Sequence, residues 1–416
     1  MVFASIITIG DELLIGQVVD TNSSWMAREL NENGIWVKRR VAVGDNKADI
    51  VKALDQESIH SDIILITGGL GPTADDITKP VLCDYFDGKM IVSESALQNV
   101  KKILARLSSQ PMLERNLKQA EVPDTCTVID NQRGTAPGMW FEKNGKIYVS
   151  MPGVPHEMMG MMTGEVVPRL TRHFKTPAIL HRTLLTAGVG ESILAEHIHG
   201  WEALLPAYIK LAYLPNYGMV RLRITGNSEN REELSKELDD QFAQLRSLVA
   251  EWLVSDKDQN LQQVVAELLK AQKKTLSTAE SCTGGYIAHL LTAEPGASAY
   301  FKGGIVSYSN DIKETVLKVS HSTLVAEGAV SEETVKQMVQ GGLLQLETDY
   351  CVAVSGIMGP DGGSEAKPVG TVWIAAGSRE KINTQKFNFR FNRQRNIELT
   401  ANYALNQLRK LILETT

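Results

Sequence analysis

Short apolar runs rich in β-branched residues recur along the first part of the chain, and they predict buried strands. Residues 5–10 and 62–66 form two such runs, each suited to a parallel strand that is buried on both faces. Residues 36–43 read as a further strand, and helical patterns cover residues 20–33 and 47–56. This alternation predicts a doubly wound α/β domain, whose ligand site lies beyond the carboxyl ends of its strands.

The pattern changes further along the chain. Residues 220–225 alternate apolar and polar side chains, as in a half-buried strand, and residues 231–253 form a long amphipathic helical pattern. The polar stretch 253–259 is typical of a linker, and strand-like runs at 350–354 and 369–376 predict another α/β domain. We therefore expect a multidomain α/β chain, with domains at residues 1–170, 171–256 and 257–416.

Composition narrows the class of protein. The chain has 416 residues, more than one domain usually holds, and 43 Lys and Arg against 49 Asp and Glu give a net charge of −6. Without a basic surplus, nucleic acid is not expected as a partner. The four scattered cysteines favour free thiols in a reducing compartment over a zinc site. No apolar run reaches membrane-spanning length, so we expect a cytoplasmic protein with no membrane partner.

Three loops of the first domain carry residues suited to binding phosphate. Asp11 and Glu12 follow the first strand, the loop 68–76 is rich in glycine, and residues 151–157 follow a strand at 146–150. Glycines let backbone N–H groups approach a phosphate closely, and nearby carboxylates can hold a divalent metal that bridges phosphate oxygens. Turn formation alone would also explain each loop. Three loops at matching topological positions favour a nucleotide or phosphate site.

A serine at the end of a strand is the candidate nucleophile of the third domain. Residues 278–285, Thr-Ala-Glu-Ser-Cys-Thr-Gly-Gly, join a strand-like run at 274–277 to a helical pattern at 286–291. The hydroxyl of Ser281 and the free N–H groups of the first helical turn would share one space, where an anion or oxyanion could bind. The alternative is that Ser281 is only a helix N-cap.

The residues alone do not identify the base that would activate Ser281. A hydroxyl is a weak nucleophile and needs a neighbouring base. No histidine of this domain lies beside a motif, since His289 falls within a helical pattern and His321 in a polar turn. A lysine can serve instead if burial lowers its pKa. Lys313, Lys302 and Tyr308 are the candidates.

Motifs of the first domain resemble the CinA family (competence/damage-inducible protein A). They are Gly10-Asp11-Glu12-Leu13-Leu14, Thr67-Gly68-Gly69-Leu70-Gly71-Pro72-Thr73 and Met151-Pro152-Gly153-Val154-Pro155, supported by Asn116, Gln119-Ala120, Pro123 and residues 134–138. In that family this domain is similar to the molybdopterin-binding fold of MoaB and MogA and is linked to a metal-dependent ADP-ribose pyrophosphatase activity. Because three loops converge at one sheet edge, we expect Gly68, Gly69, Gly71 and Thr73 to hold the diphosphate of ADP-ribose, with Asp11, Asp75 or Asp76 among the ligands of a divalent metal.

The resemblance also implies a small KH-like α/β domain in the middle of the chain. KH domains clamp RNA with a G-x-x-G loop, and no two glycines between residues 171 and 256 have that spacing. We therefore assign Arg221 and Arg223 to a solvated face. A connecting or dimer-forming role fits the domain better, and we expect a homodimer.

The third domain resembles the C-terminal CinA domain, which also occurs alone as the nicotinamide-nucleotide amidase PncC. The match covers most of residues 258–416. The resemblance implies hydrolysis of the carboxamide of nicotinamide mononucleotide without a cofactor, with Ser281 as nucleophile, Lys313 as base and Ser355 hydrogen bonded at the same site. The residues implied in substrate binding are Glu280, Thr283, Gly284, Gly285, Tyr308, Asn310, Gly356, Gly359, Gly362 and Thr371.

The leading hypothesis is a bifunctional enzyme of pyridine-nucleotide recycling, acting on nicotinamide mononucleotide and ADP-ribose. One alternative is a non-catalytic nucleotide-binding adaptor linked to competence or DNA damage, and another is a pterin-binding protein of the molybdopterin type. A degenerate motif around Ser281 would have favoured the adaptor. The intact Ser281, Lys313, Asp11 and Asp75 favour the enzyme.

Overall fold

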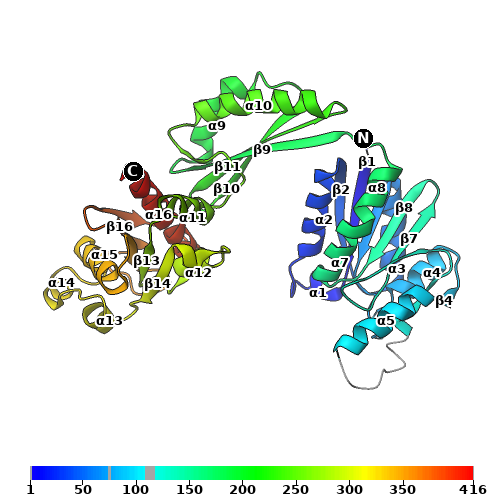
Figure 1. Ribbon diagram of the computed structural model, residues 1–416, viewed down its shortest axis with the longest axis horizontal. Coiled ribbons are helices and arrows are strands. Elements are labelled where there is room, and N and C mark those ends of the chain that lie inside the picture. The colour runs from blue at the N-terminus through cyan, green and yellow to red at the C-terminus, as the bar shows by residue number, and fades with distance from the viewer. Residues whose placement is uncertain (1, 74–75, 108–117, 416) are drawn as a thin grey trace. The chain divides into compact units, whose positions relative to one another are not determined.

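The computed structural model describes residues 2–73, 76–107 and 118–415, and it is built of mixed α/β layers, as expected. The chain divides into two compact units, one formed by residues 1–180 and 226–236 and the other by residues 181–225 and 237–416 (Figure 1). Asp75 and Asn116 lie outside the described residues. Of the helices in the described part of the chain, none is long and apolar enough to cross a membrane.

The first unit is a doubly wound domain around a six-stranded sheet in the order β2-β1-β3-β8-β7-β6. Alternate side chains of β1 face the two helical layers: Ala4 and Ile6 pack with α2 and α7, whereas Ile7 and Ile9 pack with α3 and α4. The sheet is built of β1 (Val2–Ile9), β2 (Ile35–Val43), β3 (Ile63–Thr67), β6 (Thr127–Ile129), β7 (Gly138–Lys143) and β8 (Lys146–Met151). Its helices are α1 (Asp11–Leu14), α2 (Thr21–Glu32), α3 (Lys47–His60), α4 (Thr78–Tyr85), α7 (Pro155–Met161) and α8 (Val167–His173), with a π-helical turn, η2 (Met162–Val166), joining the last two.

A small layer flanks this sheet. Strands β4 (Met90–Val92) and β5 (Glu121–Pro123) pair in antiparallel fashion, next to α5 (Glu94–Leu107) and the 3-10 turn η1 (Lys118–Ala120). Ala120 packs with Ala96 and Val100 of α5. This packing places Gln119 of η1 in the lining of a cavity at the edge of the six-stranded sheet.

Strands β1, β3 and β8 end at one edge of the sheet. They pair in parallel, with Thr8 opposite Thr67 and Thr67 opposite Met151. Because the carboxyl ends of parallel neighbours coincide, the loops that begin at Gly10, Gly68 and Pro152 meet at this edge. The three loops singled out by the sequence therefore lie together.

The middle sheet has the order β10-β11-β9-β12, and the predicted linker contributes a strand to it. Leu253 and Ser255 of β12 pair with Thr186 and Leu185 of β9, which corrects the expectation of a linker over residues 253–259. Backbone pairing with a buried strand edge outweighs the polar composition of this stretch. The elements are β9 (Ala178–Ala187), α9 (Glu191–Glu202), β10 (Ile209–Asn216), β11 (Met219–Ser228), α10 (Arg231–Leu248) and β12 (Leu253–Ser255).

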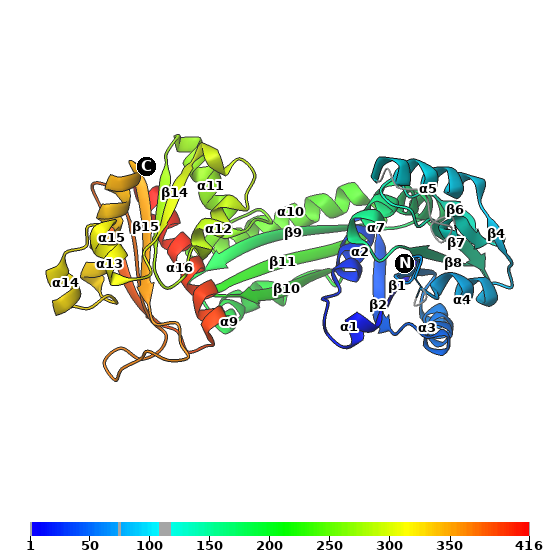
Figure 2. The same ribbon diagram turned by 90° about the horizontal axis from the view of Figure 1, so that it is seen from below.

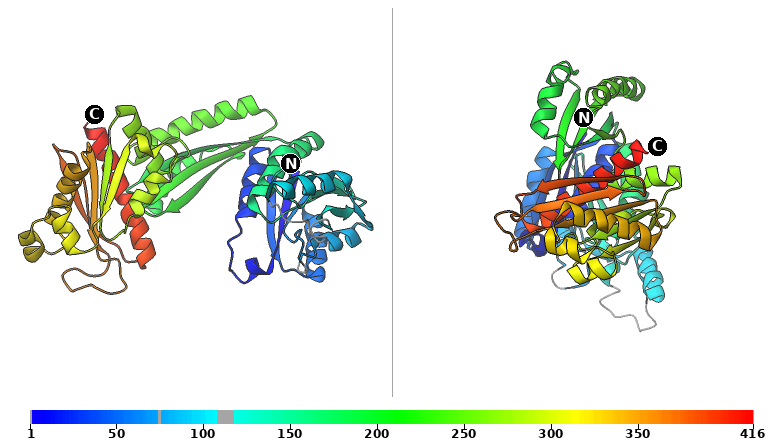
Figure 3. Two further views of the ribbon diagram at one scale, coloured as in Figure 1. Left: turned by 60° about the horizontal axis from the view of Figure 1, so that its bottom comes forward. Right: turned by 90° about the vertical axis from the view of Figure 1, so that its left-hand side faces the viewer.

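The C-terminal sheet has the order β14-β13-β15-β16-β17. Figures 2 and 3 show helices packed against this sheet. One core packs α11, α12 and α16 on the sheet, and a second core packs α15 and the segment around α14. The strands are β13 (Leu276–Glu280), β14 (Phe301–Val306), β15 (Tyr350–Gly356), β16 (Thr371–Gly377) and β17 (Ile382–Asn388). The helices are α11 (Leu261–Gln272), α12 (Tyr286–Thr292), the 3-10 turn η3 (Ala297–Ala299), α13 (Asn310–Thr315), α14 (His321–Ala326), α15 (Glu332–Leu346) and α16 (Arg393–Glu414).

The middle sheet and the C-terminal domain share a hydrophobic core. Leu185, Ala187 and Val254 belong to the same buried cluster as Leu261 of α11 and Leu405 of α16. Burying apolar surface from both parts in one cluster stabilises their association. The middle sheet therefore packs against the C-terminal domain within the second unit.

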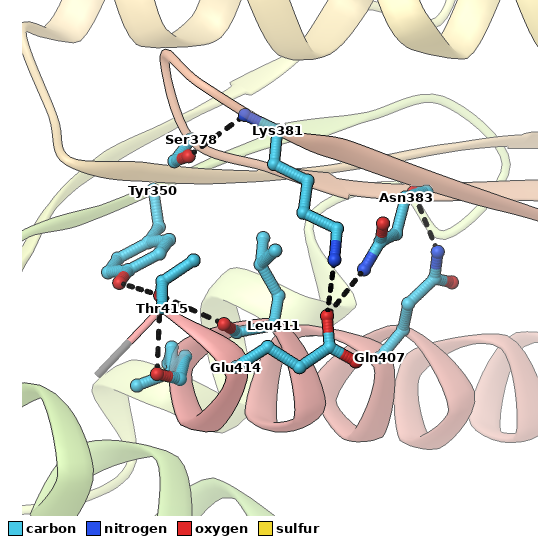
Figure 4. A network of polar contacts seen from close by, with 9 residues as sticks. Tyr350, Ser378, Lys381, Asn383, Gln407, Leu411, Glu414 and Thr415 are labelled. Carbon is cyan, nitrogen blue, oxygen red and sulfur yellow. Dashed lines mark hydrogen bonds and ion pairs between the residues drawn. The ribbon is translucent and has the colours of Figure 1, made fainter.

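The C-terminal end of α16 is anchored on the sheet by polar contacts (Figure 4). The Glu414 carboxylate accepts hydrogen bonds from Lys381 Nζ at 2.8 Å and Asn383 Nδ2 at 3.4 Å. The Tyr350 hydroxyl lies 2.7 Å from Thr415 Oγ1, and Gln407 Nε2 donates to the backbone carbonyl of Asn383. These contacts fix one end of a 22-residue helix whose other end begins at Arg393.

Candidate active site

Ser281 and Lys313 form a buried pair at the carboxyl ends of two neighbouring strands. Ser281 directly follows β13, and Lys313 lies in α13, shortly after β14. The two strands are parallel, with Glu280 opposite Val306, so the segments after them lie side by side. The distance from Lys313 Nζ to Ser281 Oγ is 3.0 Å. Ser281 is 8% exposed and Lys313 is 1% exposed.

The surroundings of Lys313 suit a neutral amine. Besides contacting Ser281, its Nζ donates to the backbone carbonyls of Ser307 at 2.7 Å and Tyr308 at 3.4 Å. Among the described residues, no carboxylate forms an ion pair with Lys313. Burial therefore lowers the pKa of the amine. A neutral amine has two N–H donors for the carbonyls and one lone pair to accept the proton of Ser281.

The other candidates are placed differently. Lys302 lies on β14 with an exposed side chain, and the Tyr308 hydroxyl accepts a hydrogen bond from Arg393. Cys282, next to the serine, is buried, and burial raises the pKa of its thiol to about 12, so the thiol stays protonated. Among these groups, Lys313 alone contacts Ser281 Oγ.

Glu280 occupies the helix N-terminus that we expected to bind an anion. Its carboxylate accepts hydrogen bonds from the backbone N–H groups of Gly285, Ile287 and Ala288 at 2.8–3.1 Å, and from Thr283 Oγ1 at 2.6 Å. The N–H of Gly284 donates to the carbonyl of Ser281. The expectation that N–H groups at Gly284 and Gly285 face the substrate is therefore wrong, because a buried carboxylate already takes the first-turn donors.

Two other backbone donors remain in this loop. The N–H groups of Cys282 and Thr283 donate to no other residue within the described part of the chain. Cys282 directly follows Ser281, and the N–H after a nucleophile is the donor that serves as an oxyanion hole in other strand-to-helix turns. These two N–H groups are the candidates for stabilising negative charge next to Ser281.

The remaining predicted residues lie in β15, in the loop that follows it, and at the starts of β16 and α13. The Ser355 hydroxyl, which we expected to be hydrogen bonded at the same site as Ser281, donates to the backbone carbonyl of Ala329 at 2.7 Å. Thr371 is buried, and its hydroxyl has no hydrogen-bond partner in the described chain. Gly356 ends β15, Gly359 and Gly362 lie in the loop that follows, and the Asn310 side chain is exposed at the start of α13.

Sequence reasoning missed Arg393. Its Nη2 donates to the Tyr308 hydroxyl at 3.0 Å and its Nη1 to the carbonyl of Gly359 at 2.9 Å, which ties two loops of the site together. Its charge is also close enough to lower the pKa of Cys282 slightly against the effect of burial. These contacts join Arg393 to residues 34 and 85 positions away in the sequence, so no local pattern predicts them.

The three loops of the first unit line a cavity of about 470 Å³. Gly68, Gly69 and Gly71 lie in its wall, as do Pro152 and Gly153, whereas Thr73 and Asp11 are not in the lining. Gly68 has φ +117°, and a Cβ atom there would lie 2.1 Å from the carbonyl oxygen of Ile9. Only glycine allows β1 and this loop to approach so closely.

The carboxylates at this cavity differ in part from those expected. Glu12, Asp45, Asp76 and Glu157 line it. Asp76 accepts hydrogen bonds from the N–H groups of Gly71 and Thr73 and so shapes the loop, and Asp11 Oδ1 accepts from the N–H of Asp45. The described residues contain no cluster of three metal-ligating side chains. Mg²⁺ usually binds through one or two carboxylates together with substrate phosphates, and the acidic lining fits that mode.

Three family models match the chain. "Probable molybdopterin binding domain" matches residues 5–172, "Damage-inducible protein CinA KH domain" matches residues 181–254, and "CinA C-terminal domain" matches residues 258–412. A CinA-like protein from Cytophaga hutchinsonii is 45% identical over 413 residues, which are 99% of each chain. Another from Flavobacterium psychrophilum is 42% identical over 412 residues, again 99% of each chain.

Among solved structures, a CinA superfamily protein from Klebsiella pneumoniae is 36% identical, covering 38% of this chain and 99% of its own, with a TM-score of 0.36. The likeness to the two CinA-like proteins extends over nearly the whole sequence, and the three matched models follow one another in the order expected. The chain therefore belongs to the CinA family.

Proposed function

We propose that the C-terminal domain hydrolyses the carboxamide of nicotinamide mononucleotide to nicotinate mononucleotide and ammonia. The observation that carries this proposal is the buried contact of 3.0 Å between Lys313 Nζ and Ser281 Oγ. A hydroxyl held against a neutral amine is an activated nucleophile, and carboxamide hydrolysis requires one. No cofactor takes part in this scheme.

The reaction proceeds through an acyl-enzyme. Lys313 accepts the Ser281 proton as Oγ bonds to the carboxamide carbon, and the N–H groups of Cys282 and Thr283 stabilise the oxyanion. The C–N bond then breaks, and the protonated Lys313 donates its proton to the departing nitrogen, which leaves as ammonia. Lys313 then deprotonates a water that attacks the ester carbon, the bond from this carbon to Ser281 Oγ breaks, and Lys313 returns the proton to Oγ as nicotinate mononucleotide leaves. Arg393 contributes a guanidinium beside these loops, and a guanidinium suits recognition of the substrate phosphate.

We further propose that the first domain hydrolyses the diphosphate of ADP-ribose with a divalent metal. The glycine-lined cavity of about 470 Å³ supports this, because three loops bring backbone groups and carboxylates to one strand edge. One or two of the lining carboxylates of Glu12, Asp45 and Asp76 would hold the metal together with the substrate diphosphate, whose charge the metal neutralises when it is bound. Gly68, Gly69 and Gly71 let the backbone approach the diphosphate.

The experiment is to incubate the purified protein separately with nicotinamide mononucleotide and with ADP-ribose, each with and without a divalent metal. We expect ammonia from the first substrate in both conditions, and AMP from the second only when metal is present. A Ser281→Ala variant should release no ammonia and keep AMP release, since the two sites lie in different units. Binding of both nucleotides without turnover would instead support the adaptor, and near-normal ammonia release by Ser281→Ala would remove the acyl-enzyme.

A further inference from the structure

A cavity of about 210 Å³ lies within the second unit, between the middle sheet and the C-terminal helices. Its walls come from the β10–β11 hairpin, from the start of α11, and from α12 and α16. We propose that this cavity binds an uncharged nitrogen heterocycle, about the size of one nucleobase, that carries an exocyclic amine or carboxamide. The site goes beyond the proposed function, because it shares no residue with the amidase site or the phosphate loops.

The hairpin is held firmly against the helices. Gly218 lies at its turn with φ +80°, and a Cβ atom there would lie 2.6 Å from the ring of Tyr403 on α16. Arg221 Nη2 donates to the carbonyl of Gln259 at 2.8 Å and to Asn260 Oδ1 at 2.6 Å. The hairpin ends beside α11 and α16 (Figures 1 and 2). These contacts therefore hold the walls of the cavity in place within the second unit.

The charges in the lining disfavour an anion. Arg221 is the one cation among the described lining residues, and it pairs with Asp258 at 3.3 Å. Glu398 brings a carboxylate: its Oε1 accepts from Gln394 Nε2 at 2.7 Å, and the Tyr217 hydroxyl lies close to the carboxylate, but its buried Oε2 accepts no hydrogen bond of good geometry. A buried acceptor without a donor is costly, and a ligand N–H group would satisfy it.

The rest of the lining suits a flat ring with polar edges. Tyr217 and Tyr286 offer aromatic surface, and Leu290 and Met219 offer aliphatic surface. The side-chain amides of Asn216, Gln262 and Asn402 make no hydrogen bonds within the described part of the chain, although each lines the cavity. Amide groups both donate and accept, as the edge of an amine- or carboxamide-bearing heterocycle requires. The volume is below the roughly 300–1,000 Å³ of pockets for larger ligands.

The test is calorimetric titration of the full-length protein with adenine and, separately, with nicotinamide. We expect at least one of the two compounds to bind. In Glu398→Gln and in Asn402→Leu, one equivalent of that compound should no longer bind or should bind at least about tenfold more weakly. AMP should bind this site at least about tenfold more weakly than adenine does. Near-UV circular dichroism checks that both variants fold.

Two control variants test whether the heterocycle binds in this cavity. Glu414→Gln changes a carboxylate on the same helix, outside the cavity, and should leave binding unchanged, as should Ser281→Ala in the amidase site. The proposal is wrong if neither heterocycle binds, or if both cavity variants bind as many equivalents of the heterocycle as the wild type with unchanged affinity. It is also wrong if Ser281→Ala loses the same equivalent that the cavity variants lose. These outcomes do not depend on the amidase reaction, because binding is measured without turnover.

Discussion

Lys313 Nζ lies 3.0 Å from Ser281 Oγ and is held there by two backbone carbonyls, with no carboxylate partner among the described residues. Burial favours the neutral form of this amine, so the pair needs no third charged residue to function as nucleophile and base.

The first prediction concerns pH. Because burial lowers the pKa of Lys313, its neutral form becomes populated at a lower pH than that of a free lysine, and ammonia release should rise with pH through this lowered pKa and then level off. Lys313→Arg should be inactive at every pH, since guanidinium does not deprotonate, and Lys313→Met should lose several powers of ten in kcat. Rate profiles between pH 6 and 10 test this. A profile without an acid limb would remove Lys313 as the base.

The same pKa shift affects stability. Over the pH range between the folded and unfolded pKa values of Lys313, the unfolded chain binds more protons than the folded chain. The free energy of unfolding of the wild type, relative to Lys313→Met, should therefore increase with pH over that range. Urea unfolding at several pH values measures it, and a constant difference would contradict the assigned shift.

Glu280 should be essential to the fold of the serine loop. Its carboxylate accepts three backbone N–H groups and the Thr283 hydroxyl while only 1% exposed. Each buried donor left unsatisfied costs about 1–3 kcal/mol, so we expect Glu280→Ala to lower the free energy of unfolding by at least about 3 kcal/mol. Denaturant unfolding measures this, with the exposed Glu251→Ala as the control within about 0.5 kcal/mol of wild type.

Arg393 should contribute to substrate binding more than to chemistry. Its guanidinium holds the Tyr308 hydroxyl and the Gly359 carbonyl and suits recognition of the substrate phosphate. Hydrogen bonds to charged groups contribute about 1.5–3 kcal/mol, so Arg393→Met should raise KM by roughly 10- to 100-fold. Arg395→Met, whose guanidinium packs over the Phe391 ring, is the matched control. An unchanged KM in Arg393→Met would refute this role.

Gly68→Ala should inactivate the first domain selectively. The new Cβ would lie 2.1 Å from the carbonyl oxygen of Ile9, so the loop must move, and a shift of about 1 Å can cost roughly 100-fold in rate. AMP release should fall by at least this factor while ammonia release persists. Gly145→Ala, at φ +73° with no atom within 4 Å of the new Cβ, is the control. Equal activity of the two variants would argue against the loop as a phosphate site.

The pattern of apolar runs along the chain was enough to predict the layers of the fold and the positions of the loops. Apolar runs at residues 5–10, 62–66 and 350–354 correspond to β1, β3 and β15, because a strand buried on both faces requires continuous apolar side chains. The strand-to-loop order then placed Ser281 and the glycines of loop 68–76 at carboxyl strand ends. Family membership also followed from these motifs.

Which side chains contact one another at the site depends on the three-dimensional packing of the elements. Spacing along the chain could not separate Lys302 from Lys313, because selecting the lysine that reaches Ser281 depends on the pairing of β13 with β14 and the turn into α13. Nor could it show that Glu280 takes the first-turn N–H groups, since a side chain's hydrogen bonds depend on the three-dimensional path of the loop. Arg393 reaches Tyr308 from 85 residues away in the sequence, because helix packing rather than local pattern sets that contact.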